Sequence, residues 1–106
     1  MKFNLNTPVI NLLTNKPMII VEEQEQKPMM LNFVLVNSLM GTEEDNKTLK
    51  AEEKLSRWNL ANRIMQASNE NKEVDLTVEE VVLLKELVTK SYFTIVAGWV
   101  LNYLTV

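Results

Sequence analysis

The chain has 106 residues, of which 46% are hydrophobic and 24% are charged, and a formal net charge of −3. These values are typical of one soluble globular domain. It contains no cysteine and no histidine, which excludes disulfide frameworks, zinc sites with thiolate or imidazole ligands, and self-contained Ser-His-Asp or Cys-His hydrolases. The negative net charge also disfavours a broad basic face for nucleic acid.

The first part of the chain predicts a small β-hairpin over residues 9–28. The runs "VINLLT" and "MIIVEE" are short and apolar, and the "NKP" between them is typical of a turn. Pro17 has no amide hydrogen, so we expect it at the turn or at a strand start. The polar "EQEQKP" predicts a second turn ending at Pro28, because a long helix does not cross a proline unbroken.

Helices are predicted for the rest of the chain, at about residues 31–40, 47–68, 78–90 and 93–104. Gly41 follows the first of them as a natural C-cap. The acidic segment 42–50 predicts a solvated loop. A hairpin followed by helices indicates an α+β fold in a single domain, residues 1–106.

The second predicted helix has an apolar stripe that is expected to face the core. The stripe is formed by Leu55, Trp58, Ala61 and Met65, and it is widened by Leu60 and Ile64. This segment is also the most basic element, through Lys47, Lys50, Lys54, Arg57 and Arg63, although neighbouring acidic residues offset these charges. A nucleic-acid-linked regulator or replication accessory is therefore an alternative function, while nucleic acid is not the expected partner.

The segment "NENKEVDLTVEE", residues 69–80, places oxygen-bearing side chains at positions 1, 3, 5, 7, 9 and 12, close to the spacing of a calcium-binding EF-hand loop. Val74 occupies the sixth position, where the sharp turn normally requires glycine. A capped helix explains the same residues, with Thr77 as N-cap and Glu80 completing a capping box. Capping is the favoured interpretation, and calcium binding is a remote alternative. We therefore predict no metal, no cofactor and no catalytic residues.

The last predicted helix belongs to "SYFTIVAGWVLNYLTV", which has no charged side chain. As a helix it is roughly 24 Å long, short of the roughly 30 Å hydrocarbon core of a membrane. We therefore expect a buried helix or a subunit interface, and no membrane insertion. The expected interface residues of a homo-oligomer are Trp99, Tyr103, Phe93 and Val96. The alternative is that Trp99 and Tyr103 belong to the core of the monomer.

The order of "TNKP", "LVNSLMG", "EEKLSRWNLANRI", "VDLTVEEVVLLKELV" and "YFTIVAGWVLNYL" resembles small uncharacterised proteins encoded in bacteriophage and prophage genomes. The resemblance spans most of the chain from residue 9. It implies a cytoplasmic, virus-encoded accessory protein and carries over no functional residue. Together with the missing catalytic chemistry, it favours a non-catalytic protein that acts by binding another protein of the phage or its host. The uncharged segment 91–106 favours self-association through the C-terminal helix.

Overall fold

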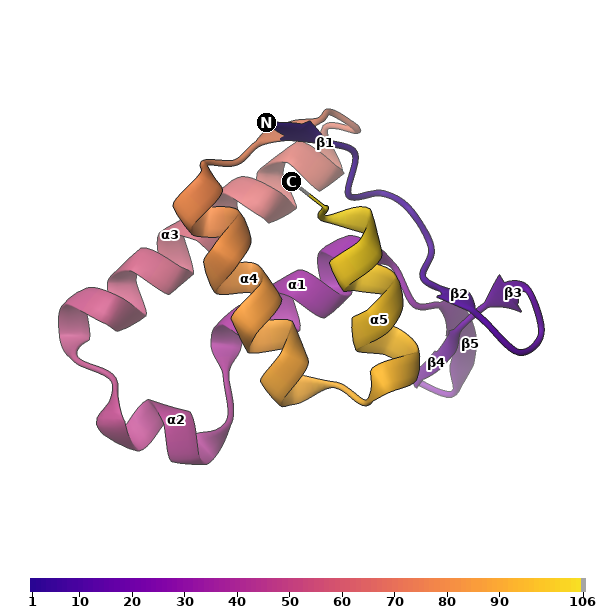
Figure 1. Ribbon diagram of the computed structural model, residues 1–106, viewed down its shortest axis with the longest axis horizontal. Coiled ribbons are helices and arrows are strands. Elements are labelled where there is room, and N and C mark those ends of the chain that lie inside the picture. The colour runs from indigo at the N-terminus through magenta and orange to yellow at the C-terminus, as the bar shows by residue number, and fades with distance from the viewer. Residues whose placement is uncertain (106) are drawn as a thin grey trace.

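The computed structural model describes residues 1–105 and confirms the α+β fold (Figure 1). Its helices are α1 (Leu31–Met40), α2 (Glu43–Thr48), α3 (Ala51–Asn69), α4 (Val78–Ser91) and α5 (Thr94–Tyr103). The strands form antiparallel pairs: β1 (Lys2–Phe3) with β6 (Val74–Asp75), β2 (Ile10–Asn11) with β3 (Lys16–Pro17), and β4 (Ile19–Glu22) with β5 (Glu25–Pro28).

Helix α1 is the central element of the core. It packs against α3 and α4, and α5 in turn packs against α4, an arrangement visible in Figure 1. Four of its side chains are buried apolar residues, Leu31, Val34, Leu35 and Leu39. Buried Ser38 satisfies its hydroxyl by donating to the Val34 carbonyl oxygen at 2.8 Å. No residue of α1 is charged, so other elements can cover most sides of the helix without burying an unpaired charge.

The N-terminal region contains two small hairpins, and the prediction of one hairpin over residues 9–28 was too simple. The first hairpin turns through Asn15, which has a positive φ. The second turns at Glu23 and Gln24, which both have positive φ. Two successive residues of this kind form a tight turn whose twist matches paired strands. The polar run "EQKP" is therefore strand β5, and it is not the second turn that the composition suggested.

The predicted helices lie close to where the sequence placed them, with two corrections. The bounds of α1 are those predicted, and its C-cap is Gly41. Residues 42–50 were expected to form a loop, but they contain α2, because the Thr42 hydroxyl accepts from the Asp45 amide at 3.1 Å and acidic residues fill the first turn. The helix predicted from residue 47 therefore starts at Ala51. The last two helices are separated by extended backbone at Tyr92 and Phe93.

Candidate functional site

The apolar stripe predicted to hold α3 in the core is largely exposed. Leu55 is 59% exposed and Trp58 is 56% exposed, and Met65 is exposed as well. Ala61 is the one member of the stripe that is buried. The core is instead contacted by the side of α3 that carries Leu60 and Ile64. The expectation that this stripe faces the core is therefore correct for Leu60, Ala61 and Ile64 and wrong for Leu55, Trp58 and Met65.

Two residues of α1 extend this exposed apolar surface. Phe33 and Met40 lie two turns apart on the same side of α1, and both are exposed. The two helices run antiparallel: the Asn32 side chain donates to Ser68 Oγ at 2.9 Å at one end, and Met40 and Trp58 line the same cavity at the other. We call this surface the α1–α3 face, and it consists of Phe33, Met40, Leu55, Trp58 and Met65.

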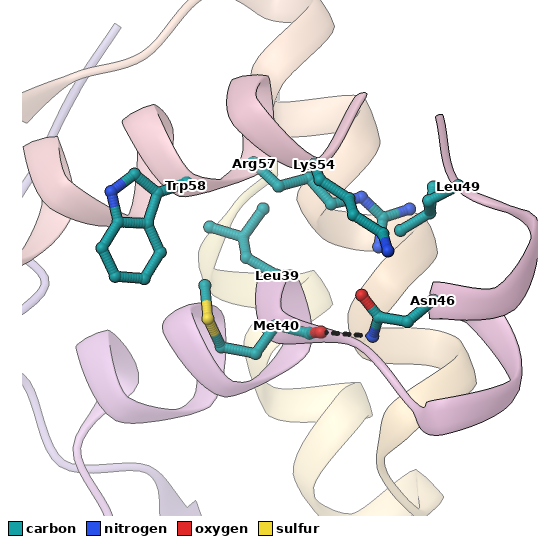
Figure 2. Close-up of a pocket in the computed structure, with 7 residues that line it drawn as sticks. All are labelled: Leu39, Met40, Asn46, Leu49, Lys54, Arg57 and Trp58. Carbon is teal, nitrogen blue, oxygen red and sulfur yellow. Dashed lines mark hydrogen bonds between the residues drawn. The ribbon is translucent and has the colours of Figure 1, made fainter. Parts of the chain in front are cut away.

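A cavity of about 150 Å³ opens at one end of the α1–α3 face, between the end of α1, helix α2 and the first half of α3. Figure 2 shows the side chains that line it. Four of them are apolar: Leu39, Met40, Leu49 and Trp58. The apolar lining makes this hollow suitable for a small ligand or an apolar side chain.

The polar groups of the cavity are mainly cationic. Lys54 and Arg57 extend from α3 toward Leu49 and Asn46. The Asn46 amide nitrogen donates to the carbonyl oxygens of Met40 at 2.9 Å and Thr42 at 2.8 Å, which fastens α2 to the end of α1. Arg57 Nη1 is buried and has no hydrogen-bond partner among residues 1–105. The cavity therefore combines apolar walls with an unsatisfied positive group.

Close packing around Gly41 shapes this cavity. Gly41 has φ 75° and ψ −179°. A Cβ atom at this position would lie 3.4 Å from both Arg57 Nη1 and Asn46 Nδ2. The missing side chain leaves room for the guanidinium group beside the turn. Sequence reasoning identified Gly41 as a helix cap, but it did not connect the cap with Arg57.

Residues 69–80 comprise the last residue of α3, strand β6 and the start of α4. Within residues 1–105 no group of three or more acidic side chains could hold a metal ion. The favoured capping interpretation is confirmed: the Thr77 amide donates to Glu80 Oε1 at 2.9 Å, and the Glu80 amide donates to Thr77 Oγ1 at 3.1 Å. Val74 belongs to β6 and pairs with Phe3. The two-residue strands β1 and β6 were missed, because such short strands have no detectable periodicity.

Glu80 also forms an ion pair with Arg63, whose Nη2 donates to the Asp75 carbonyl oxygen at 2.6 Å. Burial raises the pKa of the Glu80 carboxyl, but the hydrogen bonds from Arg63 and from the Thr77 amide outweigh burial and hold this pKa below its ordinary value. Arg63 is thus engaged in fixing the α3–α4 connection. Since Lys54 and Arg57 line the cavity, the basic residues of α3 are divided between two places.

The residues predicted to form an interface on the last helix have different environments. Val96 is only 5% exposed and belongs to the core, whereas Phe93 is 90% exposed. Trp99 and Tyr103 are half-buried and stack with ring centroids 5.2 Å apart. The Tyr103 hydroxyl donates to the Asn4 carbonyl oxygen at 2.7 Å. The structure thus brings Trp99 and Tyr103 together against the N-terminal segment and leaves Phe93 apart from the core.

No protein-family model, curated protein sequence or solved structure matches the chain. Among residues 1–105, no helix has both the length and the apolar character needed to cross a membrane.

Proposed function

We propose that this chain is a non-catalytic accessory protein of phage type that acts in the host cytoplasm by protein–protein interaction, and that it pairs with a second copy of itself through the α1–α3 face. The observation that carries the proposal is the exposure of Leu55 and Trp58 on a helix whose opposite side fills the core. Large apolar side chains gathered on one surface are characteristic of an interaction site. Tryptophan is also among the residue types that dominate the free energy of binding.

The charge distribution supports a second copy as the occupant of this face. Helix α1 has no charged residue, and the charges that adjoin the α3 stripe are of both signs: Glu52, three residues before Leu55, and Lys54 and the half-buried Arg57. The acidic residues that give the chain its net charge of −3 lie outside the five residues of the face. Two copies related by a twofold axis place the same patch on both sides of the interface. Pairing through a patch whose few charges are of both signs limits the repulsion between like charges.

The dimensions of the face are suited to a dimer. A stable interface covers about 800 Å² on each partner, which is roughly a tenth of the 7121 Å² accessible surface of the described chain. The stripe from Leu55 to Met65 extends about 15 Å along α3, and Phe33 and Met40 widen it across α1. The five residues therefore supply the apolar centre of such an interface, and the polar residues around them would supply its rim.

The non-catalytic part of the proposal is supported by composition. The chain has no histidine or cysteine, and the polar groups that line the cavity are Lys54, Arg57 and the amide of Asn46. None of these forms a nucleophile–base pair of the usual kind. The phage-type part is supported by the resemblance in sequence pattern.

Sedimentation velocity tests the proposed pairing. We expect the wild-type chain to sediment as a dimer at ~100 μM, and Leu55→Lys to sediment as a monomer at the same concentration, because a lysine would have to be buried opposite its own copy. Phe93→Lys is the matched control, since it removes another strongly exposed apolar side chain from a different surface. It should leave the dimer intact.

A wild-type monomer at that concentration would contradict the proposal. A dimer that Phe93→Lys dissociates and Leu55→Lys does not would place self-association at the C-terminal helix, as the sequence alone suggested.

A further inference from the structure

Arg57 lines the cavity beside the Gly41 turn, and its Nη1 is a buried cationic nitrogen that residues 1–105 do not satisfy. In the part of the chain that the structure describes, Arg57 Nη1 has no hydrogen-bond partner, whereas buried polar groups in proteins are nearly always paired. A buried charged donor without an acceptor is unfavourable by more than a neutral one. A ligand in the cavity would remove this penalty if the guanidinium group turned so that Nη1 faced it.

The acidic residues near the cavity do not fill this role. Asp45 is close, because its Cβ lies 3.6 Å from the position that a Gly41 Cβ would take. Yet none of the ion pairs within residues 1–105 includes Arg57. The Asp45 carboxylate forms no hydrogen bond within residues 1–105; it is the backbone amide of Asp45 that donates to the Thr42 hydroxyl at the start of α2.

From this geometry we infer that the cavity binds a carboxylate that carries a short, branched apolar group. The guanidinium group of Arg57 matches a carboxylate in its planar donor geometry, and the ammonium group of Lys54 adds a second positive charge. The apolar group lies against the walls formed by Leu39, Leu49 and Trp58. A cavity of about 150 Å³ is comparable in volume to engineered protein cavities that take up benzene.

A carboxylate is preferred over a phosphate for two reasons. Four of the lining side chains are apolar, and desolvating a second negative charge against such walls is unfavourable. The volume also leaves room for an apolar group beside the anion, which inorganic phosphate lacks. The bound carboxylate belongs either to a free small acid or to an acidic side chain of another polypeptide, and both present the same chemistry to Arg57.

This inference goes beyond the proposed self-association and does not depend on it. Leu55 belongs to the α1–α3 face but does not line the cavity. Carboxylate binding is therefore measured on both the wild-type chain and Leu55→Lys. Binding by both proteins would show that the carboxylate site does not require the dimer. Binding by the wild-type chain alone would show that the site exists only in the dimer, which would contradict the inference.

The test is an NMR titration with 3-methylbutanoate at constant ionic strength, followed through the Gly41 amide, the Asn46 side-chain amide and the Arg57 Nε–H. We expect saturable shifts at these groups. Acetate and the neutral 3-methylbutanamide should each bind at least about ten-fold more weakly, a difference of about 1.4 kcal/mol, because one lacks the apolar group and the other lacks the charge. Equal shifts with the acid and the amide, or tighter binding of inorganic phosphate, would overturn the assignment.

Variants identify the group responsible. Arg57→Gln should weaken binding of 3-methylbutanoate by at least about ten-fold, while Arg63→Gln, which removes another cation of α3 outside the cavity, should leave it unchanged. Unaltered affinity in Arg57→Gln would overturn the inference. So would binding that appears only in Asp45→Asn, because the chain's own carboxylate would then be the occupant.

The same titration distinguishes the two sources of the carboxylate. A capped Leu-Glu-Leu peptide that binds more tightly than 3-methylbutanoate indicates an acidic side chain of a polypeptide. Weaker binding of the peptide indicates a free small acid.

Discussion

Gly41 joins α1 to α2 through a backbone conformation, φ 75° and ψ −179°, that is nearly confined to glycine. We expect Gly41→Ala to lower the free energy of unfolding by about 1–3 kcal/mol, because an alanine backbone is strained at this φ, whereas its Cβ would only reach van der Waals contact with Arg57 and Asn46. Urea denaturation measures the change.

Gly98 provides the matched control, because it lies within α5 and a Cβ there would meet no atom within 4 Å. Gly98→Ala should raise the free energy of unfolding by about 0.5–1 kcal/mol through the higher helix propensity of alanine. Equal changes in the free energy of unfolding for the two substitutions would mean that Gly41 does not have the positive φ that disfavours alanine.

Glu80 gives the fold a defined dependence on pH. Its carboxylate accepts from the Thr77 amide and pairs with Arg63, so its pKa in the folded chain lies below the ordinary value that it regains on unfolding. The stabilisation is therefore present in full above the unfolded pKa and is lost as the pH falls through the folded pKa.

We expect the stability difference between the wild-type chain and Glu80→Gln to be largest at neutral pH and to shrink as the pH falls below the ordinary range of a glutamate. Thermal unfolding across this pH range measures it. Glu79→Gln, an exposed neighbour in the same helical turn, controls for the loss of one negative charge. A difference that persists unchanged in acid would show that the carboxylate form of Glu80 does not stabilise the cap.

At the scale of elements, α3 contains two leucines with opposite roles five residues apart. Leu55 is exposed and Leu60 is buried. In dilute solution, where the chain is monomeric, we expect Leu55→Ala to change the free energy of unfolding by less than about 0.5 kcal/mol. Leu60→Ala should lower it by about 2–5 kcal/mol, because it removes core contacts and leaves a cavity. Comparable losses of stability at both positions would show that Leu55 contributes to the core.

The elements that the sequence predicted best are those with local signals. The bounds of α1 and the cap of α4 follow from Gly41 and from the Thr77–Glu80 spacing, which act within a few residues of the chain. The exposure of Leu55 and Trp58 could not be predicted in this way. Both sides of α3 carry apolar residues. Which side faces the core depends on the position of α1 in space, and the periodicity of the sequence contains no information on that position.

The candidate site was missing from the sequence prediction for the same reason. The cavity requires α2, which was expected to be a loop, and it requires Gly41 to lie beside Arg57, sixteen residues further along the chain. One available signal was the combination of Thr42 with the acidic residues that follow it, which is typical of a helix start. Weighing that cap against the polar composition would have predicted α2.

At the scale of the whole molecule, the core is concentrated around α1, α4 and α5, and the first half of α3 extends away from it together with α2 (Figure 1). No residue of α2 is buried, and the buried residues of α3 begin at Leu60. This projecting part contains the most exposed residues of the α1–α3 face and the carboxylate cavity. The fold thus places both proposed activities where the chain contributes least to its own core.

The central claim is that the α1–α3 face of one copy contacts the same face of another. Isotope-filtered NOE spectroscopy on a mixture of labelled and unlabelled chains tests it most directly, because it reports contacts between copies alone. We predict intermolecular NOEs from the methyl groups of Met40 and Met65 to the indole ring of Trp58. Intermolecular NOEs confined to Phe93 and α5, or none at all where sedimentation shows a dimer, would contradict the claim.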